Sequence, residues 1–284
     1  MFRRSAWVPA LLALVVSVLP AGCASGGPGA AGSTPEVSGS GPREVRAPRP
    51  DAVFDYQLGG PYRPSPEVRA VSRDRTAEPV PGIYNVCYVN AFQAQPGAAA
   101  ARWWHRRHPG LLLRDDRGEP VVDEDWHEPL FDISTPARRA ALAVVVGRWI
   151  DGCAEAGFDA VEPDNLDSFE RSGKLLSADD AADFARLLTA RAHRRGLAVG
   201  QKNTAGLLDE RGRIGFDFAV VEECARYREC PGFAEAYGGR VFDVEYRRAD
   251  FASACERWGE ELSVTLRDRD VRPAGAAGHR YRHC

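Results

Sequence analysis

The stretch "FDAVEPDN" (158–165) decides the fold of this chain, because a buried apolar run in it ends abruptly in acidic and amide residues. Pro163 cannot donate a ladder hydrogen bond, so sheet pairing should end near it and release Asp164. A second stretch, "FDFAVVEE" (216–223), repeats both the Phe-Asp start and the acidic end. Strands that stay apolar until their last residues are typical of a sheet that is buried on both faces.

Eight such strands are predicted, and helical patterns separate the later ones. The alternation of strands and helices indicates parallel βαβ units, and eight units predict a (β/α)₈ TIM-like barrel. An open doubly wound sheet is the alternative, but no G-x-G-x-x-G motif follows a strand. The predicted strands span 53–58, 67–73, 82–90, 158–164, 197–203, 216–223, 240–246 and 262–268, and the predicted helices span 135–157, 177–196, 231–237 and 249–259.

The first half of the predicted barrel is irregular. Only about nine residues separate the second and third strands, and a crossover helix needs roughly a dozen. Residues 91–134 form a long excursion that contains tryptophans. The sequence therefore predicts an imperfect barrel with a large loop after the third strand.

Two strand-end carboxylates are the predicted catalytic pair. Asp164 lies five residues after Asp159, and Glu222 lies five residues after Asp217. Because strand side chains alternate with period two, Asp164 and Glu222 share inward parity if the two Phe-Asp pairs sit at equal depth, whereas Glu223 points away. Two facing carboxylates at a barrel mouth, where function collects, are what glycoside hydrolysis requires.

Other polar residues near strand ends and in the long loop are expected to bind the substrate. Lys202 stands out in an arginine-rich chain as a compact point charge that would keep Asp164 ionised; a purely structural pairing with Glu162 is the alternative. The predicted binding residues are Asp55, Gln57, Tyr88, Asn90, Glu128, Glu162, Asn165, Asp167, Lys202, Asn203, Glu223, Glu245 and Tyr246.

The composition excludes some classes of function. A formal net charge of −3 gives no footprint for nucleic acid. No C-x-x-C spacing is present, and we expect no metal and no cofactor.

The cysteines indicate disulfides in an exported protein. Setting Cys23 aside leaves six cysteines, an even number that permits 15 pairings. The spacing favours Cys224 with Cys230; Cys255 with Cys284 would staple the C-terminus, and Cys87 and Cys153 would remain. The sequence leaves the pairing open.

The N-terminus carries an export signal. Residues 1–23 combine a short basic region, an apolar core too short to span a bilayer comfortably, and "LPAGC" (19–23). That motif resembles a lipobox with Cys23 as the lipidated residue, although Pro20 replaces the usual aliphatic residue. Cleaved secretion and an uncleaved anchor are the alternatives. Residues 24–50 are rich in Gly, Ser, Pro and Ala and predict a flexible linker, which leaves 51–284 for the barrel.

The strand-end motifs resemble those of glycoside hydrolase family 114, the endo-α-1,4-polygalactosaminidases. The resemblance covers roughly residues 53–270, although "WHEPLFDIS" departs from the family pattern at Pro129 and Phe131. The motifs that carry it are "FDYQLGG" (54–60), "NVCYVN" (85–90), "WHEPLFDIS" (126–134), "FDAVEPDN" (158–165), "GLAVGQKN" (196–203), "FDFAVVEEC" (216–224), "YREC" (227–230) and "VFDVEY" (241–246).

The resemblance implies an exported barrel enzyme that cleaves partially deacetylated galactosamine polymers, with catalytic roles for Asp164 and Glu222. We expect a monomeric, retaining endo-glycosidase with Asp164 as nucleophile and Glu222 as acid/base. It would be a lipoprotein on the outer face of the cytoplasmic membrane, or secreted. The alternatives are a non-catalytic polysaccharide-binding lipoprotein on the same barrel and a structural envelope lipoprotein.

Overall fold

The computed structural model describes residues 44–284. The predicted signal peptide (1–23), Cys23 and most of the predicted linker lie outside this range. A nine-stranded sheet forms the centre of the described part, and its strands are β1 (Phe54–Tyr56), β2 (Ala70–Asp74), β3 (Tyr84–Asn90), β6 (Ala160–Asp164), β7 (Ala198–Lys202), β8 (Phe218–Glu222), β9 (Val241–Glu245), β10 (Ser263–Arg267) and β11 (Tyr281–His283).

The first eight strands of this sheet run parallel in chain order, and β11 pairs antiparallel with β10. The hydroxyl groups of Thr265 and Tyr281 both donate to the carbonyl oxygen of Phe54, at 2.8 and 3.2 Å, and so draw the last strands toward the first. The result is a nearly closed barrel, which confirms the predicted fold class. The eight parallel strands were predicted from the sequence, and β11 was not.

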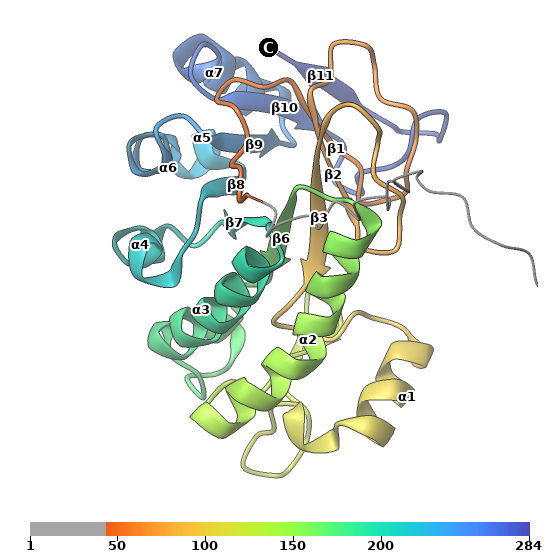
Figure 1. The fold of residues 1–284 in the computed structure, drawn as a ribbon, viewed down its shortest axis with the longest axis vertical. Helices are drawn as coiled ribbons and strands as arrows, with labels where there is room; N and C mark the ends of the chain where they lie inside the picture. Colours follow the sequence, from red (N-terminus) through yellow and green to blue (C-terminus); the bar gives the residue numbers. More distant parts are fainter. Residues whose placement is uncertain (1–43) are drawn as a thin grey trace, which may run out of the picture. The chain divides into compact units, whose positions relative to one another are not determined.

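Helices accompany the second half of the barrel. Figure 1 shows them along one side of the sheet, coloured from green to blue, whereas loops rather than helices connect the orange strands β1 and β2. This matches the predicted irregular first half. The helices are α2 (Pro136–Ala156), α3 (Ala178–Arg194), α4 (Arg211–Ile214), α5 (Cys224–Tyr227), α6 (Cys230–Tyr237) and α7 (Arg248–Trp258), with single 3₁₀ turns η2 (Ser168–Arg171) and η3 (Ala205–Glu210).

The two long helices begin and end as their sequences predict. Thr135 accepts a hydrogen bond from the backbone N–H of Arg138, and Gly157 ends α2 with a φ of 96°. Ser177 and Asp180 form a reciprocal capping box at the start of α3.

The excursion after β3 contains its own small elements. These are α1 (Ala98–Arg107), η1 (Pro109–Leu111), β4 (Val122–Asp123) and β5 (Glu128–Pro129), with β4 and β5 paired antiparallel. Asp123 pairs with Glu128 in this hairpin, and the hairpin brings Glu128 back to the barrel mouth.

The barrel interior is filled by inward side chains from alternate strand positions. The rings of Phe54 and Phe242 stack at 4.1 Å, and Phe218 packs edge-on against Phe242. A Cβ on Gly200 would lie 2.8 Å from the Phe218 ring, so a glycine in β7 makes room for that ring. Asp164, Lys202 and Glu222 continue these inward-facing rows at the carboxyl ends of β6, β7 and β8.

The aspartates of the two Phe-Asp motifs make equivalent hydrogen bonds to the preceding strand. Asp159 donates its backbone N–H to the carbonyl of Asn85, and its carboxylate accepts the N–H of the same residue at 2.9 Å. Asp217 makes the equivalent pair of bonds with Val199, at 2.8 Å. Each motif therefore fixes the register of its strand against the preceding one.

Three disulfides stabilise the barrel, and they include the Cys224–Cys230 pair that the spacing favoured. They join Cys87 to Cys153, Cys224 to Cys230, and Cys255 to Cys284. The last bond attaches the C-terminus to α7.

The start of the described range packs on the barrel. Pro48 is buried, and the carbonyl of Arg46 accepts a hydrogen bond from Tyr84, so the end of the predicted linker contacts the domain. Within residues 44–284, no helix has the length and apolar character needed to cross a membrane.

Candidate active site

A single lysine organises the carboxyl edge of the barrel. The Nζ atom of Lys202 lies 3.0 Å from Oδ1 of Asp164, 3.1 Å from Oε1 of Glu162 and 3.6 Å from Oε2 of Glu222. It also donates to the hydroxyl of Tyr56 at 3.0 Å. Three carboxylates, two from β6 and one from β8, therefore share one ammonium group. The side chain of Lys202 is only 3% exposed.

The three carboxylate side chains differ in their exposure to solvent. The side chain of Glu162 is fully buried, whereas those of Asp164 and Glu222 are 17% and 28% exposed. Asp164 and Glu222 therefore combine a shared cation with access to solvent. Their lysine-bound oxygens lie no further apart than the sum of the two contact distances, about 6.6 Å, which admits the roughly 5–5.5 Å separation of retaining glycosidases.

Asp164 is held as a carboxylate. Burial alone would raise its pKa, but the Lys202 ammonium and hydrogen bonds from Tyr88 and Lys202 outweigh that effect and hold the pKa below its usual value. The hydroxyl of Tyr88 donates to Oδ2 of Asp164 at 2.7 Å. Burial also raises the pKa of Tyr88 well above its usual value, and the charge of Asp164 adds to this, so the phenol remains a donor.

Glu222 is positioned from both of its neighbouring strands. Its backbone N–H donates to Oδ1 of Asn203 at 2.8 Å, and the hydroxyl of Tyr246 donates to its Oε1. Burial raises the pKa of Tyr246, and the negative charge of Glu222 raises it further, so this phenol too remains protonated. Lys202 lies closer to Asp164 than to Glu222, so Asp164 receives the stronger stabilisation of negative charge.

Beneath the pair lies a fully buried polar layer. Glu162 accepts hydrogen bonds from Tyr56 and Ser72, both at 2.8 Å, in addition to its ion pair with Lys202. Burial raises the pKa of Glu162 and the lysine opposes this shift. The two sequence-based readings of Lys202 are therefore compatible, because the lysine pairs with Glu162 and stabilises the charge of Asp164 at the same time.

The chain turns sharply after each of the strands β6, β7 and β8. Asn165, Asn203 and Glu223, which directly follow Asp164, Lys202 and Glu222, all have left-handed φ values of 63°, 44° and 59°. Asparagine tolerates this region better than most residues. The repeated turn lets each strand end on an inward side chain and then leave the mouth at once.

Glu128 reaches the same mouth from the excursion. Its Oε2 accepts hydrogen bonds from the side-chain amides of Asn90 at 2.8 Å and Asn165 at 3.2 Å. Asn165 also donates to Asn90 at 2.9 Å, so the three side chains form a closed cluster beside Asp164.

Several predicted binding residues are held by other partners. Asp55 is fully buried and accepts hydrogen bonds from Gln57, Tyr62 and Arg267, and Gln57 is 1% exposed. Since Phe54 and Tyr56 face the barrel interior, Asp55 and Gln57 face outward. Because of this burial, we propose that Asp55 and Gln57 support the first strand rather than contact the substrate.

We propose the same supporting role for Glu245 at the end of β9 and for Glu223 directly after β8. Glu245 is fully buried behind the mouth, where its Oε1 accepts the backbone N–H of Ala225 at 2.9 Å. Glu223 forms ion pairs with Arg226 and Arg269, both at 2.8 Å. The expected opposite orientation of Glu223 agrees with these contacts.

Asp167 is also held by another residue of the protein, Arg171. Arg171 holds it through two hydrogen bonds, at 2.9 and 2.8 Å, and lies 2.7 Å from Asp123 in the hairpin. This ion-pair chain attaches the hairpin to η2. Asn165, Asn203, Tyr88, Asn90 and Tyr246 are all at the mouth, but each contacts another site residue in this structure.

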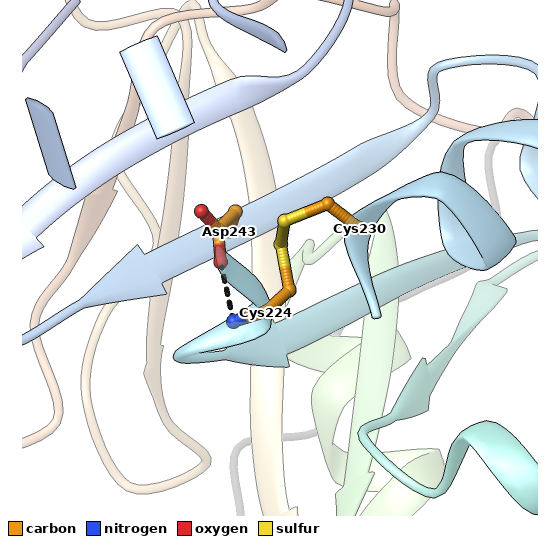
Figure 2. Close-up of side chains that lie close together, drawn as sticks. All are labelled: Cys224, Cys230 and Asp243. Atoms are coloured by element: carbon orange, nitrogen blue, oxygen red, sulfur yellow. Dashed lines mark hydrogen bonds between the residues drawn. A yellow bond between two sulfur atoms is a disulfide. The ribbon is translucent and has the colours of Figure 1, made fainter. Parts of the chain in front are cut away.

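One cluster in the described range contains residue types that can bind a metal, but its two cysteines form a disulfide. The ligand atoms of Cys224, Cys230 and Asp243 lie within 4.8 Å of one another. Figure 2 shows that the two sulfur atoms are bonded to each other and that Asp243 accepts the backbone N–H of Cys224, at 3.4 Å. A disulfide has no thiolate to offer a metal, so the cluster anchors the chain after Glu222 instead.

Sequence reasoning missed Tyr56, Ser72 and Arg171 as parts of the site. Alternation from the inward Phe54 would have pointed to Tyr56, because the two residues share a face. No local pattern marks Ser72 or Arg171, whose partners are distant in the sequence.

The chain is similar to known proteins in sequence and in fold. The model of glycoside-hydrolase family GH114 matches residues 35–284. The crystal structure of Aspergillus fumigatus Ega3 in complex with galactosamine is similar with a TM-score of 0.69 and 19% identity, over 85% of this chain and 98% of that one. The glycoside hydrolase domain of PelA from Pseudomonas aeruginosa is similar with a TM-score of 0.55 and 16% identity, over 81% and 99%. No curated protein sequence matches the chain.

Proposed function

The chain belongs to glycoside-hydrolase family GH114, and from this we propose that it cleaves α-1,4-linked galactosamine polysaccharide at internal bonds, with retention of configuration. It is a glycoside hydrolase by family. The substrate is inferred from the similarity of its fold to Ega3, whose structure contains galactosamine. The observation that carries the catalytic assignment is the shared contact of Lys202 with two partly exposed carboxylates, Asp164 and Glu222.

In the first step, Asp164 attacks the anomeric carbon while Glu222 gives its proton to the departing glycosidic oxygen. The products of this step are a glycosyl ester on Asp164 and a shortened chain with a new hydroxyl group. The ionised state of Asp164 suits attack, because Lys202 and Tyr88 stabilise the carboxylate before the reaction.

In the second step, Glu222 takes a proton from water, and the resulting nucleophile attacks the same anomeric carbon. Asp164 leaves as a carboxylate, and the product keeps the α configuration because two inversions have occurred. Asn203 and Tyr246 keep the carboxyl group of Glu222 in one place for both proton transfers.

We propose that residues 1–23 are a lipoprotein-type signal with Cys23 as the lipid attachment site, and that the linker holds the barrel domain, 51–284, outside the cytoplasmic membrane as a monomer. Release of the chain after cleaved secretion is the second route. Labelling of the expressed protein with a radioactive fatty acid, with Cys23→Ser as control, distinguishes the two.

The activity is tested with the purified domain and a panel of α-linked amino-sugar polymers. Mass spectrometry of the products should give galactosamine oligosaccharides of several lengths, which is the pattern of internal cleavage. Release of single sugars only would contradict internal cleavage. Binding of the polymer with no new reducing ends would favour the non-catalytic alternative.

A further inference from the structure

The carboxylates predicted at the strand ends and in the hairpin differ in whether they already pair with a cation. Eight carboxylates were singled out from the sequence, and six of them have a cationic partner. These pairs are Asp55 with Arg267, Glu162, Asp164 and Glu222 with Lys202, Asp167 with Arg171, and Glu223 with Arg226 and Arg269. The two exceptions are Glu128 and Glu245. Glu245 is fully buried and faces away from the mouth.

Glu128 thus combines a low exposure of 8% with the lack of a cation among the described residues. Its two hydrogen-bond donors, Asn90 and Asn165, are neutral amides, and both bind the same oxygen, Oε2. Oε1 accepts no hydrogen bond from the described residues and is not among the fully buried polar atoms, so it keeps some access to solvent. A carboxylate held in this way is a prepared acceptor for a cation.

The surroundings of Glu128 strengthen this conclusion. Burial raises its pKa to about 7; the Asn90 hydrogen bond opposes the shift, and the negative charges of Asp164 and Asp123 add to it. Tyr88 faces the same space as a neutral phenol. The nearby cation, Arg171, pairs with Asp123 and Asp167 and also donates to Oδ1 of Asn165 at 3.3 Å, but it makes no ion pair with Glu128.

We propose that Oε1 of Glu128 binds the free ammonium group of a galactosamine unit next to the cleaved bond, and that this contact makes the enzyme prefer free-amine to N-acetylated sugar. This inference rests on the proposed function. An ammonium group supplies the missing cation and three donors, whereas an acetamido group at the same carbon is neutral and bulkier.

The test compares Glu128→Gln with the wild-type enzyme on one polymer in two forms. Gln keeps the size of Glu and an oxygen for Asn90 and Asn165, but has no charge. The polymer is α-1,4-linked galactosamine, and the second form is the same preparation after chemical N-acetylation. Glu124→Gln is the matched control, because Glu124 is an exposed acid of the same hairpin.

We expect the ratio of kcat/KM for the free-amine form to that for the acetylated form to fall by roughly 10- to 100-fold in Glu128→Gln and to stay unchanged in Glu124→Gln. An unchanged ratio in Glu128→Gln overturns the inference, even if absolute activity falls. Calorimetric binding of galactosamine and N-acetylgalactosamine oligosaccharides by each protein gives a readout that needs no cleavage. If the wild type binds the free-amine oligosaccharide more tightly and Glu128→Gln does not, the inference is supported, whether or not either polymer is cleaved. Absence of cleavage would refute only the proposed function.

Discussion

Lys202 donates to Asp164 across 3.0 Å from the next strand of the barrel, and the lysine end of this ion pair is almost fully buried. The fold itself creates this contact, because β7 ends at Lys202 and the neighbouring strand β6 ends at Asp164, the carboxylate that the lysine keeps charged. Glu162 below and Glu222 beside them complete the group. The following predictions test this arrangement and its supports.

Replacing Lys202 with Met should move the acidic limb of the pH–rate profile to higher pH. In the wild type, the lysine and Tyr88 hold the pKa of Asp164 below its usual value, against the effect of burial. Without the cation, burial is opposed less, so the pKa rises and a greater fraction of Asp164 is protonated at any acidic pH. The kcat/KM profile of Lys202→Met between pH 4 and 8 checks this, and an unshifted acidic limb would count against it.

The same variant should be less stable by about 3–5 kcal/mol, because it leaves buried carboxylates without their cation. The loss should be larger at pH 7 than at acidic pH. Asp164 has a depressed pKa in the folded state, so its ion pair stabilises the fold above the unfolded pKa and stops doing so as the pH falls through the folded pKa. Urea unfolding of both proteins at two pH values measures this difference; equal losses would be inconsistent with it.

Asn203→Gly should lower kcat about tenfold while KM changes little. Asn203 has a φ of 44°, which glycine adopts without strain, so the substitution removes the bond to the N–H of Glu222 and keeps the turn. The loss of one positioning bond mainly affects the transition state. Steady-state kinetics separate the two constants, and a rise in KM alone would instead indicate a direct contact between Asn203 and the sugar.

Removing the Cys255–Cys284 disulfide should destabilise the protein by about 2–4 kcal/mol without changing kcat/KM. The bond closes a segment with a sequence separation of 29 and attaches the end of β11 to α7, away from the strands that carry the catalytic pair. Chemical unfolding and kinetics of the Cys255→Ser/Cys284→Ser variant check both parts. A large loss of activity in the folded variant would mean that β11 shapes the site.

Much of the barrel could be predicted from local pattern. The apolar runs of β6 and β8 end in polar residues, and their repeated Phe-Asp motifs fix each strand against its neighbour. Thr135 and Ser177 marked the starts of α2 and α3. β11 lacked such a signal, because it is a three-residue strand after a glycine-rich loop, and its pairing depends on β10.

The inward or outward orientation of a strand residue was predicted for some candidate site residues and not for others. Alternation was applied to β6 and β8, where it placed Asp164 and Glu222 on the inner face. It was not applied to β1, where Tyr56 faces inward and Asp55 faces outward to Arg267. At the end of β9, the partner of Glu222 is Tyr246, which directly follows the strand, and not Glu245.

Some long-range contacts could not be predicted. The bonds between Ser72 and Glu162, and between Arg171 and Asp123, join residues whose proximity depends on the closed barrel and the docked hairpin. No spacing in the sequence encodes these contacts.

The catalytic pair itself can be tested by conservative substitution. Asp164→Asn and Glu222→Gln should each lower kcat by several orders of magnitude and leave the fold intact. Circular dichroism checks the fold, and reducing-end release checks activity. Near-normal activity in either variant would remove that residue from the pair.

The central claim is that Asp164 becomes covalently bonded to the sugar. The most direct measurement incubates the enzyme with a galactosamine oligosaccharide that ends in a 5-fluoro glycosyl fluoride, which slows the second step, and identifies the labelled residue by peptide mass spectrometry. The account predicts a single adduct on Asp164 within residues 158–165. An adduct on Glu222, or turnover to a product of inverted configuration with no adduct, would contradict it.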